Sequence, residues 1–149
     1  MNFTVNDVAQ FQAQKEFIDT AIIPLVQLNL SDTGMKQSSS AVEYLMSLTN
    51  FIEQQFRGRL MLYPPFSYTE ATKSEALPLQ LQEELVQAGF KTVLFVTYDH
   101  GWTTKEGLNV IWMPPIPLES MDKTMKQRIL EDQLKQILPI LMKAWTSQV

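Results

Sequence analysis

The apolar residues of this chain fall into runs typical of buried strands and into three-and-four spacings typical of helices. The densest run is Val93–Tyr98, where β-branched and aromatic residues stand between Gly89 and the turn sequence Asp99–Gly101. Such a run predicts a fully buried strand. A second apolar run, Leu108–Met113, follows closely. A parallel crossover needs about a dozen residues or more, so we expect the two runs to pair as an antiparallel hairpin.

Two further strands are predicted in the first half of the chain. The run Ala21–Val26 has the composition of a strand, yet it contains Pro24. Proline cannot donate a ladder hydrogen bond, which predicts either an edge position or a bulge for this strand. The run Arg59–Tyr63 predicts a short strand that stops at Pro64.

The first two helices are predicted from their start signals. A helix over residues 5–19 begins at Thr4, and a longer helix over residues 40–56 begins at Ser40, where Glu43 completes a capping box. The longer helix has apolar residues three and four apart. Its apolar face is wide enough to cover one side of a sheet.

Two more helices are predicted in the second half. Pro78 fits the first turn of a helix over residues 78–88, and Gly89 follows as the C-terminal cap residue. The last helix is predicted over residues 120–146, where Pro139 should kink or split it. Its apolar stripe consists of Leu130, Leu134, Ile137, Leu141 and Trp145.

Helices and buried strands thus alternate along the chain, which favours a three-layer α/β fold with a mostly parallel sheet. We expect one Rossmann-like domain over residues 1–149, with about four helices and a four-stranded sheet. Right-handed crossovers favour the order 2-1-3-4, with strand 4 antiparallel. Pro24 in an interior first strand speaks against this order unless a bulge accommodates it.

Composition narrows the classes of function. The chain has no cysteine, which excludes disulfides and thiolate metal sites and fits a reducing, cytoplasmic compartment. Its formal net charge is −4, and no basic stripe suited to a nucleic acid is present. The longest apolar run, residues 21–30, falls short of the roughly 18 residues that cross a bilayer. We therefore expect no nucleic-acid partner and no membrane.

One stretch carries a family resemblance. The sequence from Lys15 to Leu25, Lys-Glu-Phe-Ile-Asp-Thr-Ala-Ile-Ile-Pro-Leu, resembles the opening of the YpiF-like proteins of Bacillus-type Gram-positive bacteria, a family of about this length. The resemblance rests on this single motif. It implies a bacterial cytoplasmic protein of uncharacterised function, and it supplies no catalytic residue.

The strong catalytic and cofactor motifs are missing from the sequence. The chain has five glycines, and no two are close enough for a dinucleotide fingerprint or a P-loop. Its single histidine cannot build a histidine-based metal site. We therefore predict no cofactor, no metal and no catalytic residue set.

One general rule still indicates a place for a ligand. In open α/β sheets, ligands bind beyond the carboxyl ends of the strands, where neighbouring connections diverge to opposite faces. With the order 2-1-3-4, this crevice lies between the loops after strands 1 and 3, flanked by Tyr63 and Pro64. It would gather Asn29, Ser31 and Asp32 from the first loop and Tyr98, Asp99, His100 and Trp102 from the second.

These residues allow two interpretations. A carboxylate that orients an imidazole could activate a serine hydroxyl, which would make Asp99, His100 and Ser31 a hydrolytic set. Alternatively, Asp99–Gly101 is turn chemistry that closes the hairpin, and Trp102 covers an edge of the core. We favour the turn interpretation, and we interpret Asp32 as a turn or helix-entry residue.

Two hypotheses of function follow. The first is a non-enzymatic accessory or protein-interaction domain that binds a protein partner, or self-associates as a dimer, through the apolar stripe of the last helix. The second is a small-molecule-binding or hydrolytic α/β protein that uses the crevice around Asp32, Tyr98 and His100. The sequence favours the first hypothesis.

Overall fold

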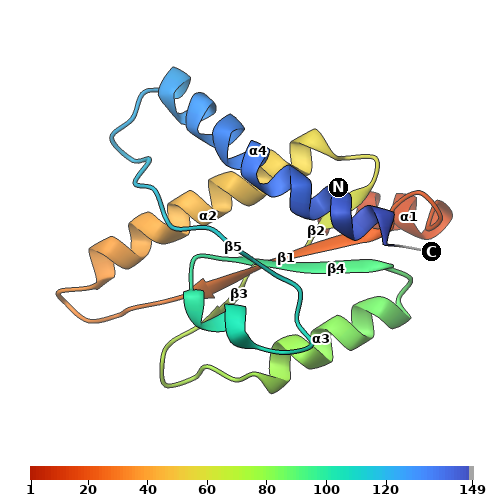
Figure 1. Ribbon diagram of the computed structural model, residues 1–149, viewed down its shortest axis with the longest axis horizontal. Helices are drawn as coiled ribbons and strands as arrows, with labels where there is room; N and C mark the ends of the chain where they lie inside the picture. Colours follow the sequence, from red (N-terminus) through yellow and green to blue (C-terminus); the bar gives the residue numbers. More distant parts are fainter. Residues whose placement is uncertain (148–149) are drawn as a thin grey trace.

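The computed structural model describes residues 1–147 and shows a layered α/β arrangement (Figure 1). The helices are α1 (Val5–Ala13), α2 (Met35–Gln55), α3 (Ala76–Gln87), the 3-10 helix η1 (His100–Thr104) and α4 (Lys123–Thr146). The strands are β1 (Thr20–Gln27), β2 (Leu60–Leu62), β3 (Phe66–Tyr68), β4 (Thr92–Thr97) and β5 (Val110–Trp112).

The strands form one sheet in the order β2-β1-β4-β5, and β3 also pairs with β1. All of these pairings are parallel. The α/β class and the mostly parallel sheet are therefore confirmed. The four expected strands lie in the expected order, and β3 is the added fifth strand. Its three residues are too few to produce a recognisable alternating pattern.

The predicted hairpin is wrong, because β5 runs parallel to β4. Phe95 pairs with Val110, so β5 starts later than the apolar run that begins at Leu108. The connection from β4 to β5, residues 98–109 with η1 among them, is therefore longer than expected and reaches the dozen or so residues that a parallel crossover needs. The turn residue Gly107, at φ 86°, then redirects the chain into β5.

β1 lies inside the sheet although Pro24 occupies its middle. Its residues Thr20–Ile22 pair with β2, and Leu25–Gln27 pair with β3. Pro24 therefore falls at the interruption between these two neighbours. On the other side, the register with β4 runs one-to-one through the Pro24–Val96 pair. Neither the edge position nor the bulge expected from Pro24 is present.

Hydrogen bonds explain why this proline is tolerated. The N–H of Tyr63 donates to the carbonyl of Ile22, and the N–H of Leu28 donates to the carbonyl of Tyr68. The backbone groups of alternate β1 residues, including position 24, therefore point toward β2 and β3. The missing N–H of Pro24 faces the gap between those strands, where no ladder bond is lost.

Helices cover both faces of the sheet (Figure 1). One face packs on α2 and α4, and its core includes Ile22 and Leu94. The other face packs on α1, α3 and η1, and its core includes Ile23 and Phe95. Successive strand residues thus enter opposite cores, as the pleat requires.

The predicted end of the first helix and the predicted start of the second are wrong. α1 ends at Ala13, because residues 14–18 turn to carry the chain into β1. α2 begins at Met35, where the carbonyl of Ser31 accepts the N–H groups that start the helix. Ser40 lies inside α2 and does not cap it.

The cap of α3 is confirmed. Gly89 has φ 119°, in the left-handed region that favours glycine. The N–H of Phe90 donates to the carbonyl of Leu85, and both side chains are buried. These features define a Schellman cap with its apolar contact, and this cap sends the chain directly toward β4.

α4 runs as one helix through Pro139, so the predicted split does not occur. Its apolar stripe packs on the core that it shares with α2, where Ile137 and Leu141 are fully buried. Trp145 is partly buried and donates from Nε1 to Oγ1 of Thr20 over 2.7 Å. The stripe therefore packs in the chain's own core, and self-association through this helix stays a prediction.

Among residues 1–147, no helix combines the length and the apolar content needed to cross a bilayer.

Candidate functional site

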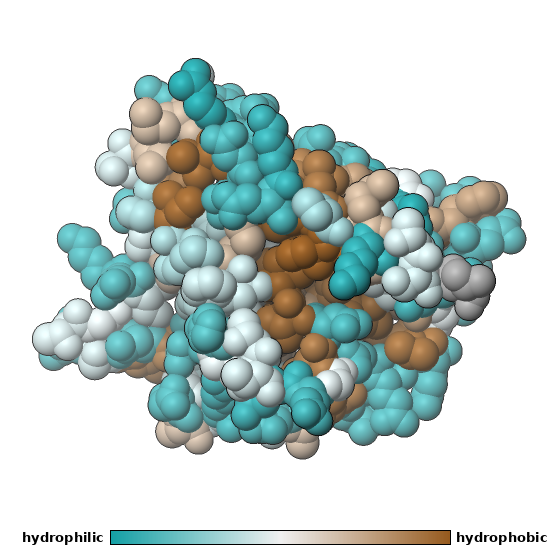
Figure 2. Space-filling view, in the orientation of Figure 1, coloured by the Kyte–Doolittle hydropathy of each residue, from teal (hydrophilic) through white to brown (hydrophobic). Residues whose placement is uncertain are grey.

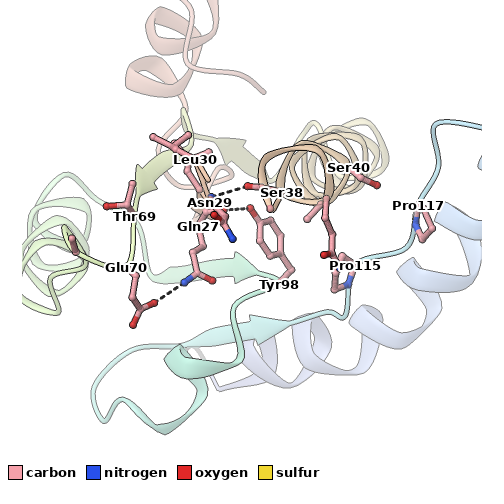
Figure 3. A pocket seen from close by; sticks show the side chains of 15 residues that line it. Gln27, Asn29, Leu30, Ser38, Ser40, Thr69, Glu70, Tyr98, Pro115 and Pro117 are labelled. Carbon is pink, nitrogen blue, oxygen red and sulfur yellow. Dashed lines mark hydrogen bonds between the residues drawn. The ribbon is translucent and has the colours of Figure 1, made fainter. Parts of the chain in front are cut away.

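The candidate site is a crevice at the carboxyl ends of β1, β3, β4 and β5 (Figure 3). β1 continues into α2 on one face of the sheet, whereas β4 continues into η1 on the other, so neighbouring connections diverge here. The cavity has a volume of about 730 Å³, a size typical of small-molecule sites. Its polar lining residues are Gln27, Asn29, Gln37, Ser38, Ser40, Thr69, Glu70 and Tyr98.

The loop after β1 is held in shape by Asn29. Its side-chain Oδ1 accepts from the N–H and the hydroxyl of Ser31, at 3.1 and 2.8 Å, and its own N–H donates to Oγ of Ser38 over 2.9 Å. A Cβ at Gly34 would lie 2.2 Å from the amide nitrogen of Asn29. Glycine is therefore required here for space, so that the Asn29 amide can lie against the start of α2.

Tyr98 projects from the end of β4 toward the loop after β1 (Figure 3). Its hydroxyl donates to the carbonyl of Gln27 over 2.6 Å. Burial and the nearby charge of Asp99 raise the pKa of Tyr98 to about 12, against a smaller lowering by the Gln27 hydrogen bond. The phenol therefore stays protonated at neutral pH, and its oxygen keeps acceptor capacity.

The charge of the crevice comes from carboxylates. Among the lining residues within 1–147, only Glu70 has a charged type of side chain, and its carboxylate accepts from Nε2 of Gln27 over 2.9 Å. At the far side, the hydroxyl of Ser40 donates to the carboxylate of Glu119. No lysine or arginine is among the residues that line this part of the described chain.

The structure divides the predicted site residues into two groups. Asn29 and Tyr98 line the crevice. Ser31 lies beside them and bonds the Asn29 side chain, whereas Asp32 is exposed in the turn before α2 and does not line the cavity. The remaining residues, Asp99, His100 and Trp102, follow the chain onto the α3 and η1 side.

Asp99 forms the centre of a separate hydrogen-bond network. Its carboxylate accepts from the hydroxyl of Tyr68 at 2.6 Å, from Nζ of Lys73 at 3.0 Å and from the N–H of Gly101 at 3.0 Å. Nε1 of Trp102 donates in turn to the Tyr68 hydroxyl, and Trp102 is fully buried.

These contacts set the ionisation of the network. Burial alone would raise the pKa of Asp99, but the hydrogen bonds from Tyr68, Lys73 and Gly101 and the charge of Lys73 lower it below its ordinary value. Burial and the Asp99 carboxylate raise the pKa of Tyr68. The Asp99 carboxylate therefore stays charged and the Tyr68 phenol stays protonated at neutral pH, and both states keep the hydrogen bond between them.

The hydrolytic set suggested by Asp99, His100 and Ser31 does not assemble. The imidazole of His100 packs edge-on against Trp112, with ring centroids 4.9 Å apart. Ser31 bonds Asn29, and within residues 1–147 no hydrogen bond joins the three proposed members. The turn interpretation fits better, because Asp99 caps η1.

Several lining residues were missed from the sequence. Gln37 and Ser38 belong to the first turns of α2, which was predicted to start later. Thr69 and Glu70 follow β3, which was not predicted. Pro115 was assigned beyond an antiparallel strand, and the parallel direction of β5 brings it to the crevice.

A metal centre has no support in the described chain. No group of three or more histidine, aspartate or glutamate side chains in residues 1–147 is arranged to hold an ion. The polar groups of the crevice are amides, hydroxyls and one carboxylate, and these suit a ligand bound by hydrogen bonds.

Comparison with known proteins gives a family for this chain. Residues 9–145 match the family described as "Protein of unknown function (DUF2487)". The chain is similar to the "Uncharacterized protein YpiF" of Bacillus subtilis (strain 168), with 29% identity over 149 residues and 99% of each chain covered. No solved structure matches it. The resemblance at residues 15–25 thus extends over the whole length, and the chain belongs to the DUF2487 family.

Proposed function

We propose that this protein is a non-enzymatic binding protein. Its ligand is a small uncharged molecule with several hydroxyl or amide groups, such as a sugar or a nucleoside. The observation that carries this proposal is the crevice of about 730 Å³ at the carboxyl ends of the strands. Such switch points are where open α/β sheets hold their ligands.

The hydrogen-bonding groups of the crevice support an uncharged polar ligand. Ser38 accepts one bond from Asn29 and keeps its hydroxyl proton for a ligand. Gln27 uses its amide nitrogen on Glu70, so its carbonyl oxygen remains as an acceptor. Gln37 lines the wall with an amide that can donate and accept. Both kinds of group therefore converge on the cavity.

The charge distribution argues against an anionic ligand. Glu70 lies on the wall, and no cationic side chain among the described lining residues offsets it. A phosphate group would have to approach this carboxylate in a cavity that is partly shielded from water, where like charges repel more strongly. We therefore expect the crevice to prefer a nucleoside or a sugar over its phosphorylated form.

The lining residues also favour binding without catalysis. Nucleophilic catalysis needs a hydroxyl that is bonded to a general base. Here the Ser38 hydroxyl oxygen accepts a backbone N–H, the Glu70 carboxylate bonds Gln27, and the Tyr98 phenol stays protonated. This arrangement holds polar groups in place without activating one of them.

The test is a thermal-shift and calorimetry experiment with matched ligand pairs, adenosine against AMP and glucose against glucose 6-phosphate. A ligand at 100 times its dissociation constant stabilises by about 2.7 kcal/mol, which raises Tm by several degrees for a chain of this size. We expect one neutral member to raise Tm and its phosphorylated form to have a smaller effect.

Three variants locate the binding. Gln37→Ala should weaken it, and Glu70→Lys should reverse the preference toward the phosphorylated form. His100→Ala is the control from outside the crevice and should change nothing. The proposal fails if no neutral compound binds, or if binding is lost with His100→Ala and kept with Gln37→Ala.

A further inference from the structure

The two ends of the crevice differ in chemistry, and the difference follows from the order of the strands. Along the sheet, β3 and β5 lie on opposite sides of the central pair β1 and β4. Glu70 follows β3, whereas Pro115 and Pro117 follow β5, so the carboxylate and the proline rings line opposite ends. Three strand spacings, roughly 14 Å in all, separate these ends. The crevice therefore has room for a ligand with one polar and one apolar part.

The polar end offers hydrogen-bond acceptors. The Glu70 carboxylate accepts from Nε2 of Gln27 over 2.9 Å. An ionised carboxylate has two oxygens with about four acceptor positions, so this bond leaves most of its capacity for a ligand. Glu70 is exposed and lines the cavity, so a ligand can reach it. Two neighbouring hydroxyls of one molecule can donate to such a carboxylate together.

The Glu70 carboxylate is held in position although it is exposed. The Gln27 side chain donates to it, and the Gln27 carbonyl accepts from the Tyr98 hydroxyl over 2.6 Å. Figure 3 shows Gln27 between Glu70 and Tyr98. These bonds tie the carboxylate to the ends of β1 and β4. A group that is ordered before binding loses less conformational freedom when a ligand arrives.

The other end of the crevice is apolar and offers ring surfaces. Pro115 and Pro117 line it together with Ala41 of α2, and the ring of Tyr98 stands between this end and the polar one. Nucleobases stack on aromatic and apolar side chains. Gln37 lies one helical turn before Ala41, on the same face of α2. Its amide can donate to and accept from the edge of a base.

The surroundings of the crevice are polar. Figure 2 shows hydrophilic and near-neutral side chains around the start of α2, whereas the strongly apolar side chains of this face gather beside α4. Gly34 and Gln37, at the start of α2, both line the crevice, so it opens on the polar side. Such surroundings suit a ligand that is rich in hydroxyls.

We propose that the ligand of the crevice is a ribonucleoside. Its 2′ and 3′ hydroxyls donate to Glu70, and its base packs at the end lined by Pro115, beside Tyr98. This proposal rests on the binding function proposed above and narrows its ligand class. A free sugar would fill only the polar end, and a deoxyribonucleoside would lack one donor to the carboxylate.

The test measures the affinity of the full protein for adenosine, 2′-deoxyadenosine and methyl ribofuranoside by isothermal titration calorimetry. Uridine and 2′-deoxyuridine are measured in parallel, because either kind of base fits the stacking argument. The deoxy forms lose a hydrogen bond to a charged acceptor, so each should bind about tenfold or more weakly than its ribose form. Methyl ribofuranoside keeps the hydroxyls without a base, and it should bind more weakly than both ribonucleosides.

A double-mutant cycle assigns the hydroxyl contact to Glu70. Glu70→Gln keeps an acceptor for the Gln27 amide but removes the charge. It should narrow the preference for ribose from about tenfold to about threefold, since a neutral acceptor bonds a hydroxyl more weakly. Glu43→Gln is the matched control, because Glu43 is exposed on α2 and does not line the crevice. It should leave the preference unchanged. Far-UV circular dichroism verifies that each variant is folded.

Three outcomes would overturn this proposal and leave the proposed binding function standing. The first is equal affinity for the ribose and deoxyribose forms, and the second is a preference for ribose that survives Glu70→Gln. The third is binding of methyl ribofuranoside or glucose as tight as that of any nucleoside. In all three, a neutral compound still binds. Absence of binding by every neutral compound would instead overturn the binding function and this proposal together.

Discussion

At the scale of single residues, Asp99, which the sequence suggested as a site residue, is the centre of a structural hydrogen-bond network. Its carboxylate gathers the Tyr68 hydroxyl, the Lys73 ammonium and the Gly101 N–H. These bonds connect β3, the loop before α3 and η1. Bonds to a charged group stabilise more than neutral ones, so the charge of Asp99 contributes to folding.

We predict that Asp99→Asn lowers the free energy of unfolding by about 1–3 kcal/mol at pH 7. The folded-state pKa of Asp99 lies below its ordinary value of 3.8. Its contribution is therefore complete above the unfolded-state pKa and is lost as pH falls through the folded-state pKa. Urea unfolding at pH 7, 5 and 3 should show a gap between wild type and variant that shrinks only below about pH 4.

Asp32→Asn is the matched control for this prediction, because Asp32 is exposed in a turn. It should change the free energy of unfolding by less than about 0.5 kcal/mol. A gap for Asp99→Asn that stays constant down to pH 3 would show that the carboxylate charge is unimportant.

At the scale of elements, prolines are placed where the structure reduces their cost. Pro24 faces the break between β2 and β3, so its missing N–H removes no ladder bond. Pro139 is different, because α4 continues through it as one helix. A proline in a helix interior removes a bond to the residue four positions earlier and strains the preceding turn.

We predict that Pro139→Ala raises the free energy of unfolding by about 1–3 kcal/mol. The alanine restores an N–H donor to α4 at an exposed position. Pro139→Gly restores the same donor but adds backbone freedom, so it should be about 1 kcal/mol less stable than the alanine variant. Chemical denaturation of the three proteins compares them, and a destabilised alanine variant would mean that α4 depends on this proline for its packing.

At the scale of the whole molecule, α4 completes one of the two cores. Its apolar stripe packs with α2 against the sheet, and Leu141 is fully buried. A side chain in this position stabilises the fold of its own chain.

We predict that Leu141→Ala lowers the free energy of unfolding by about 2–5 kcal/mol. The urea midpoint of the wild type should be the same at low and at twentyfold higher protein concentration, since the stripe is buried within one chain. Met142→Ala, at an exposed neighbour, is the control and should have little effect. A midpoint that rises with concentration would restore the stripe of α4 as an association surface.

The sequence predicted the α/β class, the order of four strands and the cap at Gly89, because each depends on local patterns that the fold keeps. At the candidate site it identified Asn29 and Tyr98, since the position of a switch point follows from strand order. It missed Gln37 and Glu70, whose place depends on where α2 starts and on the short strand β3. A single domain, the cytoplasmic location and the lack of a nucleic-acid partner stay predictions.

The chain by itself determined which segments are buried and how they alternate, because apolar periodicity and end signals act over a few residues. Only the tertiary structure decided the direction of β5, since β5 begins at Val110 and leaves residues 98–109, with the 3-10 helix η1 among them, for a parallel crossover. It also decided the separate surroundings of Tyr98 and Asp99. Successive residues at a strand end point to opposite faces of the sheet. The helices packed on each face then decide that Tyr98 lies at a crevice and Asp99 in a closed hydrogen-bond network.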